Sequence, residues 1–330
     1  MPYNKKSNKE APMSKSLTIS AVVPMYNSAL FIERAISSII QQSMRPDEII
    51  VVNDGSTDNG VEIIERTFPQ VKIISINNSG EGAARNAGIK ASCSTWIAFL
   101  DSDDFWLPTH LESVSNVINQ FTEASVVATG IQKWSPNVPL EIRQPLIEVG
   151  EVDYFKEQVN RWNVITSSSA VIRKEAFDSA GLFKKLPMGT DIDMWERLAF
   201  DHKFARTTEV TAVYVKNSSG TSAKFGQKLA EYSETSGEDL PLYRSKNVDV
   251  GQSRTEKKVL QMYRNQIGYA SVTALLFHGQ VNLAKKEAQA FTGPAKIRIR
   301  LVLTLVRHFP NVFLRIIVIT IKKMLKLKNR

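Results

Sequence analysis

The stretch Trp-Ile-Ala-Phe-Leu-Asp-Ser-Asp-Asp, residues 96–104, passes from five apolar residues directly to four polar ones, three of which are acids. Its apolar half is typical of a short buried strand, and the acids after it would crowd one end of a sheet. Like charges packed together are costly unless a cation or hydrogen-bond donors compensate them. A divalent ion that keeps waters and bridges one or two carboxylates to a diphosphate would do so. The stretch therefore predicts a metal site at a strand end, with a solvated loop as the alternative.

Apolar runs alternate with helical patterns over the whole region from Leu17 to about Leu107. Short β-branched runs separated by helices indicate a parallel sheet with crossovers on both faces. We therefore expect an α/β fold with a mostly parallel central sheet. The expected strands are residues 18–23, 48–52, 71–76 and 96–100, and the expected helices are residues 29–42, 59–67 and 81–91.

A polar segment follows each of these strands, and two of the segments carry clustered carboxylates. In open α/β sheets, ligands bind at the carboxyl ends of the strands. We therefore expect the four segments to converge on one edge of the sheet. They are residues 24–27, 53–58, 77–82 and 101–104.

Two of these segments contain residues suited to a nucleotide. Asp54 ends an expected strand, where a carboxylate can accept the imide N–H of a uracil-like base or bind a ribose hydroxyl; a turn or helix-capping role is the alternative. Residues 80–86 join a turn of small residues to a helix start, which favours close approach of an anion. Arg85 lies one turn into that helix and could stack on the nucleotide or bond to it, with a solvent-facing side chain as the alternative.

A further acidic segment, residues 189–195, opens an expected helix. One acid there can cap the helix while another projects into a cleft. Asp191 as a general base fits an inverting transfer, in which a carboxylate takes the proton of an acceptor hydroxyl. N-capping is the alternative role for Asp191. Trp106, just beyond the first acidic stretch, could be a platform for a sugar ring or a packing residue.

Taken together, these residues resemble the family-2 inverting glycosyltransferases, which have the Rossmann-like GT-A fold and include bacterial cell-envelope and polysaccharide enzymes. The resemblance covers about residues 17–216 and rests on five motifs in the family's order: residues 22–27, 51–58, 82–88, 99–104 and 189–197. It implies a catalytic base, a divalent ion (Mn²⁺ or Mg²⁺), a nucleotide-sugar site and an acceptor site. Their implied residues are Asp191 for the base, Asp103 for the ion, Pro24, Tyr26, Asp54, Arg85, Asp101 and Ser102 for the nucleotide sugar, and Trp106, Asp193 and Trp195 for the acceptor.

Two positions depart from the family pattern. Thr190 stands where a glutamate usually precedes the base, so both Asp191 and Asp193 stay open as the proton acceptor. Asn217 stands near the place where the family often carries a histidine, so metal ligands beyond Asp103 also stay open.

The resemblance implies transfer of a sugar, with inversion, from a nucleotide-diphosphate sugar to a hydroxyl of a glycan or lipid-linked acceptor. A UDP-sugar is expected because Asp54 suits uracil. The first alternative is a non-catalytic nucleotide-sugar-binding or scaffold protein, which the Thr190 departure favours. The second is a nucleotidyltransferase, although residues 24–27 lack the glycine-rich, basic phosphate loop of that class.

The rest of the chain reads as appendages to this domain. Residues 256–277 and 281–291 are expected to form a helical hairpin. In the second half of the domain, the expected strands are residues 126–131 and 169–172, and the expected helices are residues 174–180 and 191–200. The expected division is a flexible tail (1–16), a glycosyltransferase domain (17–216) with a nucleotide-binding part (17–107) and an acceptor-binding part (108–216), a linker (217–255), and a helical hairpin with a basic amphipathic tail (256–330).

The net charge of +9 belongs to the C-terminal tail. Residues 295–330 hold ten of the 42 Lys and Arg and no acid, which leaves 32 basic against 33 acidic residues in the body. This argues against a nucleic-acid-binding body and for a localised anionic partner. Residues 301–321 are apolar but interrupted by charges, which disfavours a membrane span. Two alternatives stay open: a basic amphipathic segment on an anionic membrane, or a terminal helix packed on the body.

The start of the chain and its cysteine point to a cytoplasmic protein, associated with the inner face of the membrane if the tail binds lipid. Residues 1–15 are polar and basic without an apolar stretch, so no signal peptide or anchor is expected. Cys93 is the only cysteine and lies among neighbours that are expected to belong to the core. We expect it to be a buried thiol in a reducing compartment.

Overall fold

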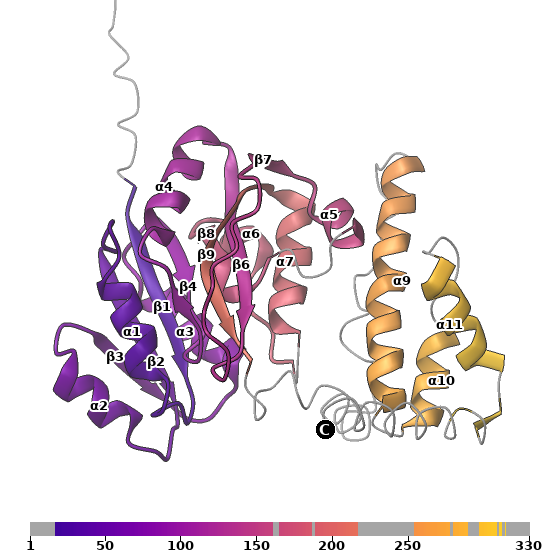
Figure 1. The fold of residues 1–330 in the computed structure, drawn as a ribbon, viewed down its shortest axis with the longest axis horizontal. Helices are drawn as coiled ribbons and strands as arrows, with labels where there is room; N and C mark the ends of the chain where they lie inside the picture. The colour runs from indigo at the N-terminus through magenta and orange to yellow at the C-terminus, as the bar shows by residue number, and fades with distance from the viewer. Residues whose placement is uncertain are drawn as a thin grey trace, which may run out of the picture.

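The computed structural model describes residues 17–160, 165–186, 189–216, 254–277, 280–289, 297–308, 310, 311 and 314. Within them, a nine-stranded sheet forms the centre of the molecule, in the order β3-β2-β1-β4-β8-β6-β9-β5 with β7 paired to β9. Helices flank this sheet, and a separate group of helices lies beside it (Figure 1). The expected tail (1–16) and nearly all of the expected linker (217–255) lie outside the described residues.

The first half of the sheet is parallel, as the sequence predicts. Strands β1 (Ile19–Met25), β2 (Glu48–Asp54), β3 (Lys72–Ile76) and β4 (Trp96–Phe99) pair in the order β3-β2-β1-β4. The crossover helices are α1 (Ile32–Ile40), α2 (Gly60–Thr67) and α3 (Glu81–Ala91). Every residue of β1 is buried. Apolar side chains of this strand point alternately into two cores, one on each face of the sheet, which is why its sequence is continuously apolar.

The second half of the sheet mixes directions. Strand β8 runs antiparallel to β4 and β6, and β9 runs parallel to β6, while β5 and β7 run antiparallel to β9. Six of the nine strands therefore point the same way. The elements are β5 (Phe105–Trp106), α4 (His110–Gln120), β6 (Ala124–Trp134), β7 (Val149–Val152), α5 (Tyr154–Asn160), the 3₁₀ turn η1 (Ser167–Ser169), β8 (Ala170–Arg173), α6 (Ala176–Ala180), α7 (Thr190–Asp201) and β9 (Lys203–Val215).

A helical extension follows, built from α9 (Arg254–Phe277), α10 (Val281–Gln289) and α11 (Ile297–His308). Helices α9 and α10 lie where two helices are expected, and they pack on each other. Figure 1 shows α9 beside α5 and α7, and one apolar core runs from the sheet into the extension. Helix α11 buries Ile299, Leu303 and Val306, so this part of the basic tail packs on the protein. Residues 315–330 lie outside the described part.

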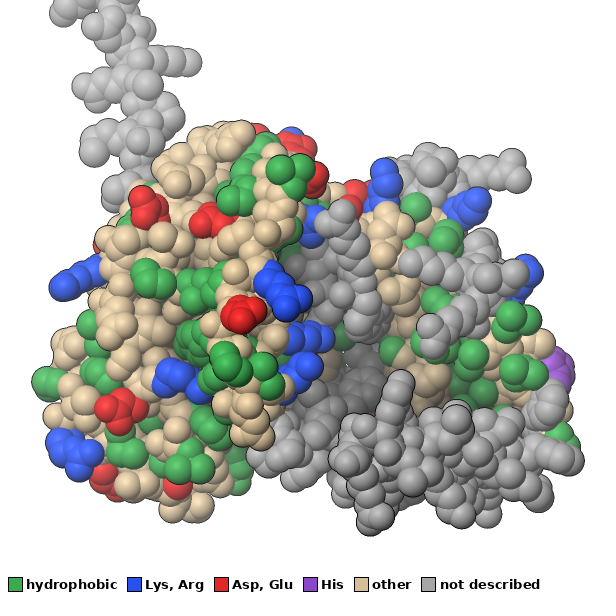
Figure 2. Space-filling view, viewed as in Figure 1, with side chains coloured by type: hydrophobic (Ala, Val, Ile, Leu, Met, Phe, Trp, Pro, Cys, Tyr) green, Lys and Arg blue, Asp and Glu red, His purple; other side chains and the backbone are tan. Residues whose placement is uncertain are grey.

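The structure also bears on the expected absence of a membrane span and on the expected burial of Cys93. No helix in the described part of the chain is both long and apolar enough to cross a membrane. Cys93, expected to be buried, is exposed, which corrects that prediction. It lies in the short turn between α3 and β4, where its amide donates to the Glu48 carboxylate instead of joining the adjacent core. Figure 2 shows acidic and basic side chains interspersed over the described surface of the sheet domain on this face, in keeping with a nearly neutral body.

Candidate active site

The polar segments after β1, β2, β3 and β4 converge on one edge of the sheet, as expected. Their side chains bind one another across the loops. The Ser28 and Ser102 hydroxyls lie 2.7 Å apart, and the Ala29 amide donates to Asp58 at 2.8 Å. The Ser79 amide donates to the Asp54 carboxylate at 2.7 Å. Four loops thus form one rigid rim.

Asp54 is buried at the end of β2 and shapes the next loop. One carboxylate oxygen accepts the Ser79 N–H and the other accepts the Gly80 N–H, at 2.7 and 2.8 Å. The two bonds fix Gly80 at a φ of 94°, a conformation that side chains disfavour. A nucleobase contact at Asp54 would have to use the remaining lone pairs of the same oxygens.

Pro24 and Tyr26 occupy different environments at the end of β1. Pro24 is buried within the strand, opposite Val52. Tyr26 is 49% exposed at the rim, next to Asn27, whose φ of 48° turns the chain sharply. Of the two, Tyr26 exposes its side chain at the rim, while Pro24 is covered within the strand.

The acidic loop at residues 101–104 is tied down from several elements. The Ser168 hydroxyl of η1 donates to Asp104 at 2.6 Å, and the Val215 amide at the end of β9 donates to the other Asp104 oxygen at 2.9 Å. Arg34 of α1 donates to the Asp103 carbonyl group. Sequence reasoning missed Asp104, Ser168 and Arg34, since none of these contacts is local in the chain. They hold Asp101, Ser102 and Asp103 in place at the strand end.

Arg85 is buried beneath this loop, with 1% of its side chain exposed. Its guanidinium pairs with Asp101 at 2.7 Å and with Glu81 of its own helix, and it lies 5.4 Å from the centre of the Phe183 ring. Burial alone would lower the pKa of Arg85, but Glu81, Asp101 and Asp191 raise it above its ordinary value. Arg85 can reach a nucleotide only if these ion pairs rearrange. Glu81 was not predicted as a site residue, although it lies one helical turn from Arg85.

The acids of the site repel one another in a buried setting. Burial raises the pKa of Asp101 to about 7, with Glu81 and Asp103 adding to the effect and Arg85 opposing it. Burial and the neighbouring Asp101 raise the pKa of Asp104 to about 8. Arg34 attracts Asp103 and Asp104 as Arg85 attracts Asp101, and Asp101 and Asp104 keep their protons to a higher pH than free carboxyl groups do.

Asp191 and Asp193 both lie in the first turn of α7, which packs on the first turn of α3. A Cβ added at Gly82 would lie 3.5 Å from the Thr190 side chain of α7, and 2.9 Å from the Lys184 carbonyl oxygen in the segment before this helix. Asp193 is held by ion pairs to Lys184 at 2.7 Å and Arg197 at 2.8 Å. Burial raises the pKa of Asp191, which Arg85 lowers and Glu81 raises. Asp191 is thus the acid of this turn that interacts with the site charges.

The two tryptophans expected to contact an acceptor are packing residues, which corrects that prediction. Trp106 is 2% exposed; its indole N–H donates to the Ser168 carbonyl group at 2.8 Å, and its ring stacks on His110. Burial lowers the pKa of His110 to about 3, so its ring is neutral. Trp195 is fully buried against Phe183. Both rings contact protein on all sides, so neither can bind a sugar.

The residues present fit a divalent ion that is shared with a ligand. Among the described residues, no three His, Cys, Asp or Glu side chains are grouped to hold a metal ion by themselves. Mg²⁺ and Mn²⁺ are commonly held by one or two carboxylates, with diphosphate oxygens and waters completing the shell. Asp103, on a loop that Arg34 and Asp104 hold in place at the strand end, suits this arrangement.

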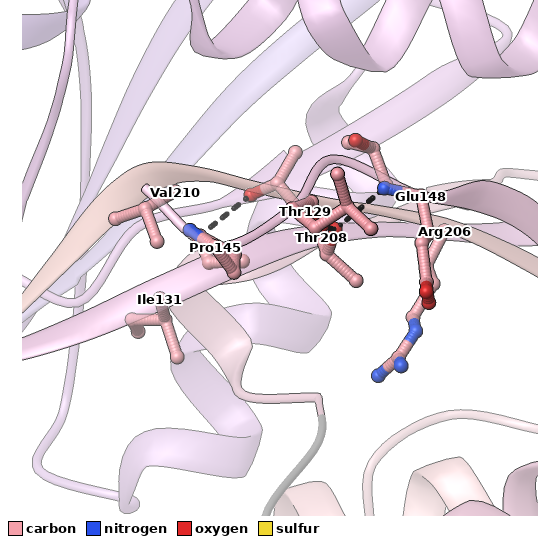
Figure 3. Close-up of a pocket in the computed structure, with 10 residues that line it drawn as sticks. Thr129, Ile131, Pro145, Glu148, Arg206, Thr208 and Val210 are labelled. Carbon is pink, nitrogen blue, oxygen red and sulfur yellow. Dashed lines mark hydrogen bonds between the residues drawn. The ribbon is translucent and has the colours of Figure 1, made fainter. Parts of the chain in front are cut away.

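A hollow lies apart from the strand ends, over the middle of β6 and β9 (Figure 3). Its polar groups bind one another: the Glu148 amide donates to the Thr208 hydroxyl at 2.8 Å, and the Val210 amide donates to Gln144 at 2.7 Å. The Arg206 guanidinium pairs with Glu157 at 3.3 Å. None of the predicted site residues lines this hollow.

The family model described as "Glycosyl transferase family 2" matches residues 20–181. Residues 20–181 therefore form a glycosyl transferase family 2 domain. The match covers the strands and loops that carry Asp54, Arg85 and Asp103. It ends before α7, so Asp191 and the helical extension lie beyond it.

Curated relatives of the chain are named as glycosyltransferases. The chain is 28% identical over 226 residues to the uncharacterized glycosyltransferase YwdF of Bacillus subtilis (strain 168), covering 66% of this chain and 81% of YwdF. Other curated relatives, 36–39% identical, are matched over only about a third of their length.

Two solved structures show the same fold. S. aureus TarS 1–349 in complex with UDP-GlcNAc has a TM-score of 0.66 at 17% identity, over 93% of this chain and 92% of TarS 1–349. The mannosyltransferase PcManGT from Pyrobaculum calidifontis, in complex with GDP-Man and Mn²⁺, has a TM-score of 0.53 at 17% identity, over 91% of this chain and 83% of that one. The chain therefore has a GT-A fold, as its motifs imply.

Proposed function

We propose that this protein is a glycosyltransferase that moves a sugar from a nucleotide-diphosphate sugar to a hydroxyl group of a glycan or lipid-linked acceptor. The observation that carries the proposal is the position of Asp191 in the first turn of α7, which packs on α3 and where Asp191 interacts with Arg85 and Glu81. The complexes of TarS with UDP-GlcNAc and of PcManGT with GDP-Man support a nucleotide-sugar donor on this fold.

The proposed reaction is a single displacement with inversion at the anomeric carbon. The acceptor oxygen forms a bond to that carbon while the bond to the diphosphate oxygen breaks, and the nucleoside diphosphate leaves with the electron pair. Asp191 takes the proton of the acceptor hydroxyl. Its raised pKa suits a base, because a carboxylate of ordinary pKa holds a proton too weakly to remove one from an alcohol.

Asp191 is proposed as the base in preference to Asp193, since two cations already hold Asp193 at 2.7 and 2.8 Å. A divalent ion at Asp103 would neutralise charge on the leaving diphosphate. The Mn²⁺ in the PcManGT complex supports such an ion. A UDP-sugar is proposed as the donor because the Asp54 carboxylate lies at the strand end where it could accept a uracil N–H.

The test is release of nucleoside diphosphate from a panel of UDP-, GDP- and dTDP-sugars with mixed glycan and lipid acceptors. Asp191→Asn should lower the release rate at least about 100-fold, the usual contribution of a general base, and leave donor binding intact. Asp201→Asn, in the exposed last turn of the same helix, is the matched control and should be fully active. Donor binding without release by the wild-type protein would instead favour the non-catalytic binding alternative.

We also propose that residues 295–330 bring the protein to the cytoplasmic face of an anionic membrane. The outward side of α11 exposes Leu301 (57%) and Leu305 (46%) next to the exposed Arg300. The segment contains ten Lys and Arg and no acid, which suits anionic lipid. The full chain should co-sediment with vesicles that contain phosphatidylglycerol, and a Leu301→Ser, Leu305→Ser variant should do so less. Equal binding to purely zwitterionic vesicles would contradict the proposal.

A further inference from the structure

A buried cluster of polar side chains joins the helical extension to α7. The Tyr263 hydroxyl of α9 donates to the Glu196 carboxylate of α7 at 2.8 Å. The Tyr154 hydroxyl of α5 lies 3.4 Å from the Tyr263 hydroxyl. The relative exposures are only 9% for Glu196 and 3% for each tyrosine. Three elements distant in the sequence thus meet at one hydrogen-bonded carboxylate.

The surroundings make this contact specific. The Tyr263 ring lies 6.0 Å from the Tyr154 ring and 5.3 Å from the Phe155 ring. One turn along α9, the side-chain amide of Gln266 donates to the main-chain carbonyl oxygen of Gln158 in α5 at 2.8 Å. A buried carboxylate without a donor is costly, so the Tyr263 hydroxyl fixes where α9 and α7 can sit relative to each other.

Helix α7 is consequently held at two points. Its first turn, which carries Asp191, packs on α3 at Gly82, and its middle is bound by α9 through Glu196. Glu196 follows Asp191 by five residues, so a shift of the helix at Glu196 moves the Asp191 carboxylate as well. Displacements of about 1 Å can cost about 100-fold in rate where a base must meet a reacting hydroxyl.

We propose that the helical extension is part of the catalytic unit, and that Tyr263, acting through Glu196, is a positioning residue for Asp191. This inference rests on the proposed glycosyltransferase function. It gives a role to residues 254–289, which lie beyond the segment matched by the family model.

The test compares Tyr263→Phe with Tyr269→Phe, the same change two turns further along α9 where Tyr269 is only half-buried. Tyr263→Phe should lower kcat for nucleoside diphosphate release about tenfold and leave KM for the donor within about twofold, because Asp191 is displaced while the donor loops are not. Tyr269→Phe should match the wild type. In an Asp191→Asn background, Tyr263→Phe should cause no further loss, because a residue that acts through the base has nothing left to position.

Wild-type kcat in Tyr263→Phe, or an equal further loss in the Asp191→Asn background, would overturn the inference alone. Absence of release by the wild-type chain would overturn the proposed function, and the inference with it. If Tyr263→Phe does not fold, as judged by its thermal melting curve, the activities of Glu196→Gln and Glu196→Ala test the inference in its place. The glutamine keeps an oxygen that accepts the Tyr263 hydroxyl and should retain activity within about threefold, whereas the alanine should not; full activity in both would overturn the inference.

Discussion

Arg85 forms ion pairs with both Glu81 and Asp101, so one guanidinium group is the common partner of two carboxylates at the site. A buried guanidinium with two carboxylate partners acts as a fixed positive centre, toward which Asp191 is also drawn. Glu81 is the exposed member of the group, with about half of its side chain in solvent. It can therefore be changed without opening the core.

Replacing Glu81 should make Asp191 more acidic. Glu81 raises the pKa of Asp191, so Glu81→Gln should lower that pKa; Arg85 and Tyr154, the other charged or titratable groups that interact with Asp191, stay in place. Because the base works only when deprotonated, the acid limb of the kcat profile should move to lower pH. The measurement is the pH dependence of kcat, with Glu65→Gln on the exposed side of α2 as the control. An acid limb that stays or moves upward would contradict the prediction.

At the scale of elements, the sequence predicts the first half of the sheet well because each strand there is a continuous apolar run. The β9 strand was missed, since Thr207, Thr208 and Glu209 interrupt its apolar pattern at the bend opposite Gly130. Helix α4 carries a helical pattern, with Leu111, Val114, Val117 and Ile118 all buried on one side, which could have identified it.

The candidate site could likewise be predicted only in part, because the sequence shows local patterns but not contacts between distant segments. Asp54, Asp101 and Asp103 could be placed at one edge because strand ends share an edge. The orientation of Trp106, Trp195 and Cys93 could not, because a residue type does not show which neighbours from distant segments cover it. The roles of Arg34 and Tyr263 could not be predicted for the same reason. Arg34 binds the Asp103 carbonyl group, 69 positions away, and Tyr263 binds Glu196, 67 positions away.

The junction between α7 and α9 should make stability depend on pH. Burial raises the pKa of Glu196 from 4.5 to about 7. Because the folded protein holds this proton more tightly than the unfolded chain does, the free energy of unfolding is highest below pH 4.5 and falls as the pH rises toward 7. A shift of this size corresponds to a loss on the order of 3 kcal/mol.

Glu196→Gln should remove this dependence while keeping an acceptor for Tyr263. The free energy of unfolding in urea, measured at pH 5 and pH 8, should fall less with pH in Glu196→Gln than in the wild type. The exposed Glu65→Gln variant serves as the control. A pH slope that is equal in the wild type and in Glu196→Gln would refute the assignment.

At the scale of the molecule, a neutral family 2 domain carries a helical extension that shares its core and continues into a basic tail. The division of the chain at residues 216 and 256 remains a prediction. The shared core favours one cooperative unit over two independent domains, since α9 buries Tyr263 and Ile267 against the sheet domain.

Ligands should stabilise this unit jointly. With one carboxylate and the diphosphate sharing the ion, UDP and Mn²⁺ together should raise Tm by roughly 5 °C at saturating concentrations, and by more than the sum of their separate effects. Asp103→Ala should abolish the extra shift, whereas Asp178→Ala on the exposed side of α6 should keep it. The measurement is thermal melting with each ligand alone and with both. Mn²⁺ that stabilises equally without UDP would argue for a metal site made by the protein alone.

The crossing of α3 and α7 limits how this protein could be redesigned. If residues 79–82 were randomised to seek another donor, Ser79 could vary because its amide carries the loop contact, and Glu81 could vary with the loss of its ion pair to Arg85. Glycine should be recovered at both other positions, for unrelated reasons. Position 80 requires it for its backbone angle, and position 82 because a methyl group there would lie 2.9 Å from the Lys184 carbonyl oxygen and 3.5 Å from Thr190 of α7. New specificity would have to come from the rim, with this crossing left unchanged.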